Sequence, residues 1–429
     1  MWHITSNKLV DADTYGSHLG KTATEAVLNL QLILDNCRIW KQNFGMIFND
    51  ADGCYDRIPP SLADIALRRL GCPKSVTQAH TAAQKGMRHH IKTGSGVSPG
   101  YIKYSDMIKA IYTAGVIMLL TGPIGGVGQG GGASPIIWLA IILMMLQVYK
   151  QKCEGISIVN KITNTIVNYW IISYVDDNTI VRSFSNNTTE DEMLQSLKKC
   201  LLVWNKLLTL TGGALSLEKC RVSIMKWTSD FWGRQTMKEN KQNKTIDISE
   251  DGQGKTKCKL HRLEPGDAER ILGIRLPMAG VMTQEYNYWL QQMNDLAIIV
   301  YNAPFSPRDA ALVYQTCYKP MIKYALPITI FSSEQLHEIQ RKFIFHLLPK
   351  LGVNCHSPRD IVYGPCESGG LGLMDLNVEQ PIHSLQVYIG HTRRNDNAGK
   401  CLQTTLFDTQ LESGLDKPFF TQDHKNVIM

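Results

Sequence analysis

The sequence predicts an α+β protein in which a sheet-containing domain precedes a helical domain. Short apolar runs rich in β-branched and aromatic residues alternate with helical patterns up to about residue 278. From about Gln284 onward the pattern is mainly helical and is interrupted by prolines. A chain of 429 residues is long enough for two or three domains with a sizeable core.

Three helices are expected before the helical domain on the basis of periodicity and caps. Residues 22–40 have helical periodicity, and residues 190–210 form an amphipathic pattern that a Gly-Gly pair ends. Ser61 and Asp64 match a capping box, which predicts a helix that starts near Ser61 and stops at Gly71.

A fourth helix is expected in the uncharged stretch from Ile111 to Tyr149. Its two apolar blocks are separated by a Gly-rich segment, and each is shorter than the roughly 20 residues of a membrane-spanning helix. We therefore expect a buried core helix that Pro135 opens, and no membrane partner. The alternative is a membrane protein built on this stretch.

The strands are expected in short apolar runs. "FGMIF" (44–48) predicts a buried strand, and residues 165–175 and 179–181 predict a hairpin with a break at Asp-Asp-Asn. Residues 214–227 read as strand, turn and strand, and residues 270–278 return to strand character. The polar stretch 234–262 is expected to be a mobile loop or a long hairpin.

Composition and charge limit the class of protein. Hydrophobic residues make up 44% of the chain and charged residues 19%, which is typical of a globular protein. The formal net charge is +7 and the pI is about 8.7, so an anionic partner such as nucleic acid is permitted but not required. The 11 cysteines are scattered, and the N-terminus has no apolar signal region. We expect free thiols in an intracellular protein, either nuclear or cytoplasmic.

Asp176 and Asp177 lie side by side at the expected hairpin tip. A plain turn is one interpretation, because Asp and Asn are ordinary turn residues. A metal site is the other, because adjacent carboxylates repel each other unless a cation lies beside them. Asp50, at the end of the buried strand, is the best partner for this pair. Such carboxylates can hold two Mg²⁺ ions for an in-line phosphoryl displacement.

Five sequence motifs occur in one order along the chain: "DADGCYDRI" (50–58), "QGGGASP" (129–135), "YVDD" (174–177), "GGALSLEKC" (212–220) and "RILGIRL" (270–276). Together they resemble the motifs of a reverse transcriptase of the LINE-like, non-LTR retrotransposon type. "GGLGLMDL" (369–376) resembles a segment common downstream of the polymerase in such elements. The resemblance covers roughly residues 14–380.

The resemblance implies a right-hand polymerase fold with an antiparallel palm sheet that carries helices on one face. The domains that it implies are partial fingers at 1–43, a palm at 44–283 with the polar insertion near 234–262, a helical thumb at 284–352 and a C-terminal retroelement region at 353–429. The earlier strands of the fingers would lie upstream of Met1, so the fingers are expected to be truncated.

The activity that the resemblance implies is RNA-directed DNA synthesis. Two Mg²⁺ ions, or Mn²⁺, would support nucleotidyl transfer from a deoxynucleoside triphosphate to a primer 3′-OH. The partners would be an RNA template and a DNA primer. Because the fingers look truncated, the alternative is a catalytically impaired, nucleic-acid-binding remnant of a retrotransposon polymerase.

The resemblance also implies roles for residues around the acidic pair. Asp50 and Asp176 would be the principal metal ligands, Asp177 would support them, and the Ala51 carbonyl could add a ligand. Lys219 would lie near the triphosphate as a charge partner or as a proton donor to pyrophosphate. The alternative for Lys219 is an ordinary surface lysine.

Five further residues would contact the substrates. Tyr55 would exclude a 2′-OH and so favour deoxynucleotides, unless it is simply a core aromatic. Gln129 and Gly130 would let the backbone approach the incoming nucleotide and the template base. Tyr174 would support the primer end, and Lys21 stands where the family has a basic residue that holds the triphosphate.

Overall fold

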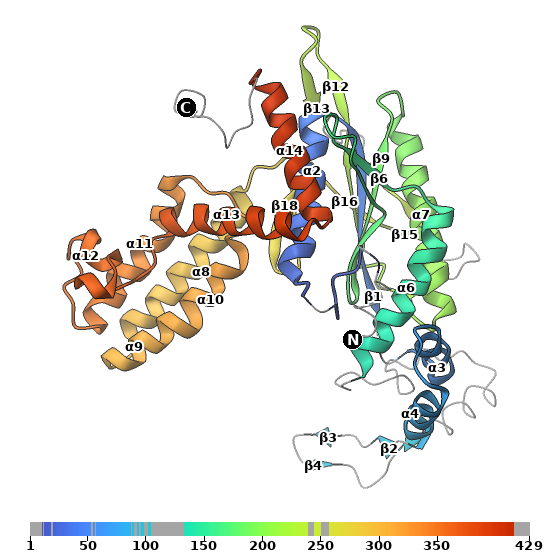
Figure 1. The fold of residues 1–429 in the computed structure, drawn as a ribbon, viewed down its shortest axis with the longest axis horizontal. Helices are drawn as coiled ribbons and strands as arrows, with labels where there is room; N and C mark the ends of the chain where they lie inside the picture. Colours follow the sequence, from blue (N-terminus) through green and yellow to red (C-terminus); the bar gives the residue numbers. More distant parts are fainter. Residues whose placement is uncertain are drawn as a thin grey trace. The chain divides into compact units, whose positions relative to one another are not determined.

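The computed structural model describes residues 11, 13–18, 20–52, 55, 57–86, 88–89, 92–93, 96–97, 102–103, 133–238, 244–249 and 257–415. The chain divides into two compact units (Figure 1). Unit 1 contains Met1–Ala26, Gln42–Ser157 and Asn168–Arg262, and unit 2 contains Val27–Lys41, Ile158–Val167 and Leu263–Met429.

Unit 1 is built on a six-stranded sheet with a long strand, β1, at its centre. The strand order is β16 (His261–Leu263), β11 (Arg221–Met225), β1 (Asn43–Asp52), β9 (Asp177–Phe184) and β8 (Ile171–Tyr174), and β10 (Ala214–Leu215) also pairs with β1. Strand β1 is antiparallel to β9, β10 and β11, and β8 is antiparallel to β9. Thr14 forms a parallel bridge with Ser173, which makes the sheet mixed at this edge.

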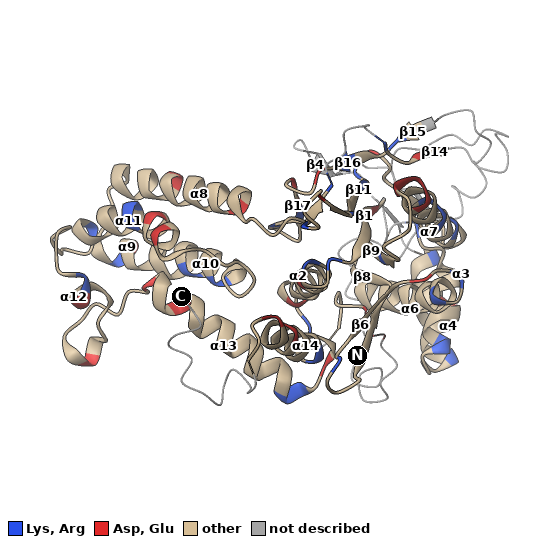
Figure 2. Cartoon of the chain, turned by 90° about the horizontal axis from the view of Figure 1, so that it is seen from above, with Lys and Arg blue, Asp and Glu red and all other residues tan. Residues whose placement is uncertain are grey.

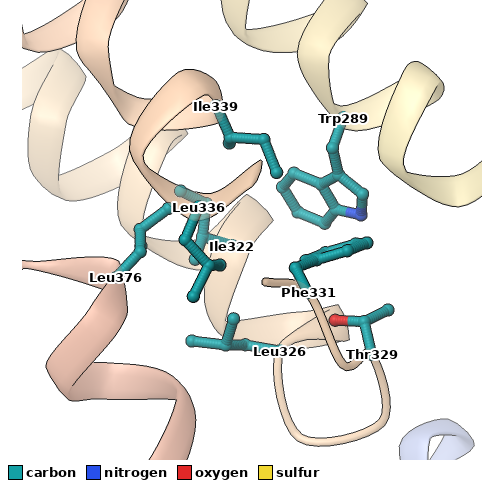
Figure 3. A pocket seen from close by; sticks show the side chains of 8 residues that line it. All are labelled: Trp289, Ile322, Leu326, Thr329, Phe331, Leu336, Ile339 and Leu376. Carbon is teal, nitrogen blue, oxygen red and sulfur yellow. The ribbon is translucent and has the colours of Figure 1, made fainter. Parts of the chain in front are cut away.

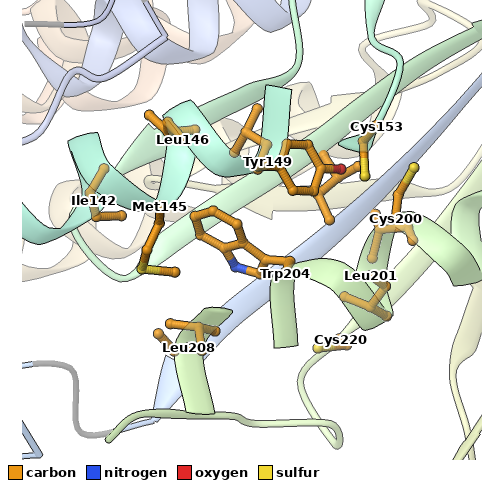
Figure 4. Packing of buried hydrophobic residues seen from close by; sticks show 14 of the residues in the cluster. Ile142, Met145, Leu146, Tyr149, Cys153, Cys200, Leu201, Trp204, Leu208 and Cys220 are labelled. Atoms are coloured by element: carbon orange, nitrogen blue, oxygen red, sulfur yellow. The ribbon is translucent and has the colours of Figure 1, made fainter. Parts of the chain in front are cut away.

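Helices α6 (Ser134–Lys152) and α7 (Glu190–Leu210) pack together over one face of this sheet (Figure 1). Gly45 of β1 leaves room for Leu197 of α7, whose side chain would lie 2.6 Å from a Cβ at this position. Figure 4 shows the packing between the two helices, where Trp204 of α7 meets Tyr149 of α6 edge to face at 5.8 Å. Thr189 and Glu192 form the capping box that starts α7.

Outside the six-stranded sheet, the described residues between 60 and 259 form two further helices and five short strand pairs. The helices are α3 (Pro60–Arg69) and α4 (Lys74–Gly86). The pairs are β2 (Arg88–His89) with β5 (Ile102–Lys103), β3 (Lys92–Thr93) with β4 (Gly96–Val97), β6 (Ile156–Val159) with β7 (Ile166–Tyr169), β12 (Trp227–Ser229) with β13 (Gln235–Met237), and β14 (Asp247–Ser249) with β15 (Lys257–Lys259). The described part of the polar insertion therefore forms short strands in separate pairings and not one long hairpin.

Unit 2 is mainly helical, as the sequence predicts. It contains most of α2 (Ala23–Ile39) and the hairpin of β17 (Ala268–Ile271) with β18 (Ile274–Pro277), followed by α8 (Thr283–Asn302), α9 (Pro307–Val313), the π-helical turn η1 (Tyr314–Tyr318), α10 (Lys319–Ala325), α11 (Ser333–Lys350), α12 (Arg359–Tyr363), the 3-10 turn η2 (Cys366–Ser368), α13 (Leu376–Arg394) and α14 (Asn397–Glu412). Figure 2 shows α2 beside α14. Asp408 of α14 accepts hydrogen bonds from Asn36 Nδ2 at 3.2 Å and Trp40 Nε1 at 2.8 Å.

Three local expectations were wrong. The capping box expected at Ser61 and Asp64 is absent, although the helix does start near Ser61: Pro60 begins its first turn without a side-chain cap, and Asp64 pairs with Arg68. The expected strand 165–175 is two strands, interrupted at Trp170, with different partners. The turn after it consists of Val175 and Asp176, so the Asp-Asp-Asn break is not a loop.

Helix α6 is a core helix, as expected. Among the described residues it is the one helix that is long and apolar enough to cross a membrane, and 61% of its most apolar window is buried inside the protein. Ile137, Ile141 and Leu146 are completely buried. The other apolar block, 111–120, lies outside the described residues.

Candidate active site

Two neighbouring strands bring acidic residues from distant parts of the sequence together. In the antiparallel pairing of β1 with β9, Asp50 lies directly opposite Asp177. Tyr174 of β8 lies directly opposite Asp177 on the other side. Directly opposed residues place their side chains on the same face of a sheet, with Cβ atoms about 5 Å apart. Asp50, Asp177 and Tyr174 therefore form a row across three strands, and Asp176 lies in the adjacent turn.

Strand β1 differs from expectation at this point. Asp50 does not end the strand, because β1 continues to Asp52 through its pairing with β10. Asp50 is therefore held on paired backbone on both sides, and its own carbonyl accepts a hydrogen bond from the Ser216 amide at 3.0 Å. The amide of buried Ala51 donates to the Asp176 carbonyl at 3.2 Å, which ties the acidic turn to β1.

The turn that carries Asp176 has an unusual backbone. Val175 has a φ of 59°, whereas Asp176 is not among the described residues with a positive φ. A two-residue hairpin turn with a positive φ at its first position normally has glycine there. A β-branched residue in this conformation is strained by roughly 1–2 kcal/mol, so neighbouring groups must hold it.

Two neighbours hold the turn in place. The indole Nε1 of Trp138, a buried residue of α6, donates to the Val175 carbonyl at 2.7 Å. Gly16 lies against the other side, where a Cβ would come within 2.5 Å of the Val175 amide nitrogen. The segment that contains Gly16 is fixed to β8, because Tyr15 donates to the Ser173 carbonyl and Ser173 donates to the Asp13 carbonyl.

Two of the acidic residues, Asp176 and Asp177, have raised pKa values. Asp177 is exposed, but partial desolvation by the surrounding protein raises its pKa to about 6, and the charges of Asp176 and Asp50 add to this shift. Burial also raises the pKa of Asp176, and the charge of Asp50 again adds to the effect. The ammonium group of Lys219 opposes both shifts and bonds to Asp50 Oδ2 at 2.6 Å. Lys219 itself is largely exposed.

The carboxylate oxygens of this site suit a hard divalent cation whose coordination shell is completed by oxygens of the substrate. Within the described ranges, no group of three or more Asp, Glu, His or Cys side chains is placed to hold a metal ion by itself. Mg²⁺ in phosphoryl-transfer sites uses one or two carboxylates, and water and substrate phosphates supply the remaining oxygens. The carboxylates of Asp50, Asp176 and Asp177 repel each other, which favours a cation between them.

Tyr55 packs close to this turn through Trp138. The two rings meet edge to face, with centroids 6.5 Å apart, and Tyr55 is half-buried against the hydrophobic core. Part of the Tyr55 side chain is therefore packed against the core, which is what the core-aromatic interpretation predicts. Because Trp138 also holds Val175, Tyr55 and the acidic turn have this tryptophan as a common neighbour.

Of the remaining expected residues, the structure describes Lys21. Lys21 Nζ donates to the Thr14 carbonyl at 3.1 Å and lies 4.4 Å from the centre of the Tyr15 ring. Lys21 thus supports the segment that packs on β8. Gln129 and Gly130 lie outside the described residues.

Sequence reasoning missed Trp138, Gly16 and Val175 as supports of the turn. Trp138 left one signal, because it carries the single N–H donor among the side chains of the apolar run "IIWLAIILMM". A buried indole usually needs a hydrogen-bond acceptor. Nothing in the sequence identified that acceptor.

A cavity in unit 2 is a poorer candidate for a functional site (Figure 3). It measures about 10 Å³, and apart from Thr329 its lining is apolar: Trp289, Ile322, Leu326, Phe331, Leu336, Ile339 and Leu376. This volume is about the minimum for one water, and an apolar cavity of this kind stays dry. It contains no convergent polar groups.

Comparisons of this chain with known proteins show only limited similarity in sequence and structure. No protein-family model matches the sequence, and no curated protein matches it. Telomerase from Candida albicans bound to a fragment of telomeric RNA is 12% identical, with a TM-score of 0.37 over 96% of this chain and 53% of that chain. Telomerase from Candida tropicalis matches with 12% identity and a TM-score of 0.35 in its RNA complex, over 95% of this chain and 55% of that chain. Its apo form is 11% identical, with a TM-score of 0.30, over 93% of this chain and 58% of that chain. This chain therefore spans little more than half the length of the telomerase chains, and scores at this level do not establish a common fold.

Proposed function

We propose that the chain is an RNA-directed DNA polymerase of the LINE-like, non-LTR retrotransposon type. The observation that carries the proposal is the row of Asp50 and Asp177 on adjacent strands, with Asp176 beside them and Lys219 bonded to Asp50. Paired carboxylates next to one exposed ammonium group suit a reaction in which charged phosphates meet a divalent cation. The order of the five sequence motifs supports the same activity.

In this proposal the reaction is nucleotidyl transfer. A primer 3′-OH attacks the α-phosphate of a deoxynucleoside triphosphate, a new phosphodiester bond forms, and pyrophosphate leaves. Asp50, Asp176 and Asp177 would hold two Mg²⁺ ions, or Mn²⁺, and so position the attacking and leaving oxygens. Bound there, the ions would stabilise the negative charge that develops on those oxygens.

Lys219 has two positions in the proposed cycle. In the free protein its ammonium group neutralises Asp50. Because divalent cations compete for the same carboxylate, we expect Lys219 to leave Asp50 when the substrate binds. It would then contact the triphosphate and give a proton to pyrophosphate.

A primer-extension assay with an RNA template, a DNA primer and Mg²⁺ tests the proposal. We expect Asp50→Asn and Asp176→Asn to lower the extension rate by at least about 100-fold, because each variant loses transition-state charge stabilisation. Asp295→Asn, in α8 of unit 2, is the matched control and should extend at the wild-type rate. Template binding by gel shift should be retained in all variants.

Two further measurements sharpen the test. Mg²⁺ should raise the thermal midpoint of the wild type and not that of Asp50→Asn, because a ligand of the native state stabilises it. Tyr55→Ala should increase ribonucleotide incorporation relative to deoxynucleotide incorporation. A wild-type chain that binds RNA but extends no primer would contradict the proposal and favour a catalytically impaired nucleic-acid-binding remnant.

A further inference from the structure

The loop between β12 and β13, the hairpin labelled in Figure 1, carries two adjacent aromatic side chains that are exposed to solvent. Phe231 is 93% exposed and Trp232 is 79% exposed. Their rings meet edge to face, with centroids 5.3 Å apart and an interplanar angle of 87°. Single exposed apolar residues are common on proteins, whereas two neighbouring large aromatic rings at the end of a hairpin suggest a binding surface.

The loop that presents these rings is held by its own hydrogen bonds. Asp230 Oδ1 accepts from the amides of Trp232 at 2.9 Å and Arg234 at 2.8 Å. The Asp230 amide donates to the Arg234 carbonyl at 2.9 Å, and the Gly233 amide donates to the Asp230 carbonyl at 3.0 Å. Gly233 has a φ of 76°, which suits glycine. A loop fixed in this way loses little conformational freedom when a ligand binds.

Among the described residues, the neighbours of the rings in sequence are polar and include an exposed cation, Arg234. In the sequence the two rings are flanked by the polar residues Thr228, Ser229, Gln235 and Thr236. The exposed guanidinium group of Arg234 makes no hydrogen bond or ion pair with another described residue. Two rings alone are too small for a stable protein interface, which usually buries more than about 1,000 Å².

We propose that Phe231 and Trp232 form a stacking platform for unpaired bases of single-stranded RNA, with Arg234 contacting a phosphate. Aromatic faces stack on any base, and a neighbouring arginine meets the backbone charge, which is the usual chemistry of single-strand binding. The inference rests on the proposed function in one respect, because the RNA is taken to be the template of the polymerase. It adds a template contact outside the acidic site.

Fluorescence anisotropy with a labelled single-stranded RNA of about 12 nucleotides tests the platform. Each stacked ring contributes at least about fivefold to affinity, so Phe231→Ala/Trp232→Ala should weaken binding by about 25-fold or more. Phe231→Tyr/Trp232→Tyr keeps both rings and should bind like the wild type. Phe231→Leu/Trp232→Leu keeps apolar surface without rings and should be as weak as the alanine variant.

Three controls separate stacking from other causes. Leu210→Ala, which removes a side chain 79% exposed in α7, should leave affinity unchanged. Duplex RNA offers few unpaired bases, so its affinity should be equal for the wild type and the alanine variant. Arg234→Gln should reduce the slope of log affinity against log salt concentration by about 0.7.

Several results would overturn the platform. One is an equal affinity of the wild type and the alanine variant for single-stranded RNA. A second is wild-type affinity in the leucine variant. A third is binding to phosphatidylserine vesicles that depends on the two rings. The platform and the polymerase proposal can fail separately. Primer extension by the wild type with no ring-dependent RNA binding would refute the platform alone, and ring-dependent RNA binding without extension would refute the polymerase activity alone.

Discussion

Replacing Trp138 with phenylalanine tests the support of the acidic turn. In the native protein the indole donates to the Val175 carbonyl at 2.7 Å, next to a residue with a strained backbone. Trp138→Phe keeps an aromatic ring in the core but removes the N–H donor. The Val175 carbonyl then loses its donor in a half-buried position. We expect the turn to become less ordered and the protein less stable.

The magnitude follows from two contributions. A buried acceptor without a partner costs about 1–3 kcal/mol. The smaller ring also leaves a void and weakens the edge contact with Tyr55, which adds about 1–2 kcal/mol. The free energy of unfolding should therefore fall by about 2–5 kcal/mol.

Trp204 provides a matched control in the same core cluster. It is completely buried and meets Tyr149 edge to face, as Trp138 meets Tyr55, but its Nε1 has no hydrogen-bond partner among the described residues. Trp204→Phe therefore makes a comparable void and loses no hydrogen bond, and it also removes a buried donor without a partner. We expect Trp138→Phe to be the more destabilising change by about 2 kcal/mol.

Urea unfolding followed by far-ultraviolet circular dichroism measures this difference without relying on tryptophan fluorescence. A difference of about 2 kcal/mol corresponds to a midpoint lower by about 0.5 M or more for Trp138→Phe than for Trp204→Phe. At temperatures where both variants are folded, primer extension should slow only in Trp138→Phe. Equal midpoints, or a lower midpoint for Trp204→Phe, would refute the supporting role of the indole.

Three other perturbations have expected outcomes. The raised pKa of Asp177 means that the folded protein binds its proton more tightly than the unfolded chain, so metal-free stability should fall as pH rises from about 4 to about 6. Asp177→Asn should remove this part of the pH dependence of the unfolding free energy, measured by urea titration with a chelator present. A pH profile that is unchanged in Asp177→Asn would contradict this assignment. Arg262 and Lys238 both form ion pairs with the carboxylate of Glu190, and the Arg262 side chain is the more buried of the two. Arg262→Met should lower the free energy of unfolding by about 3 kcal/mol, and Lys238→Met should lower it by less than about 1 kcal/mol. Equal losses in chemical denaturation would argue against this difference. Gly212→Ala should destabilise the protein by more than about 2 kcal/mol, because its Cβ would lie 2.4 Å from a backbone oxygen and its φ is 87°. A Cβ at Gly213 would make only ordinary contacts, so Gly213→Ala should change the thermal midpoint little.

The sequence predicted the elements of unit 1 where local signals agreed. Helix α7 was predicted at 190–210 because its periodicity and its Gly-Gly end indicated the same bounds. The meeting of Asp50 with the acidic pair was expected because both follow apolar strands. Its geometry could not be predicted, because the register that places Asp50 opposite Asp177 is set by pairing along the whole of β1.

The sequence could not reveal the turn or its support. Val175 belongs to an apolar run that continues a strand, and local propensity does not predict a left-handed conformation for valine. Contacts with Trp138 and Gly16 select that conformation, and both residues are distant from it in sequence. At α3, two signals competed, and Pro60 determined the start of the helix rather than Ser61.

The central position of β1 has a consequence for how the chain is made. Strand β1 is synthesised before its partners β9 and β11, which lie far downstream in the sequence. At about 5–20 residues per second, the roughly 130 residues between Asp50 and Asp177 take about 6–25 s to synthesise. During that time an apolar strand with two open edges is exposed in the nascent chain, and such edges promote aggregation. We therefore expect the yield of soluble protein to depend on chaperones that bind the first half of the chain until β9 emerges.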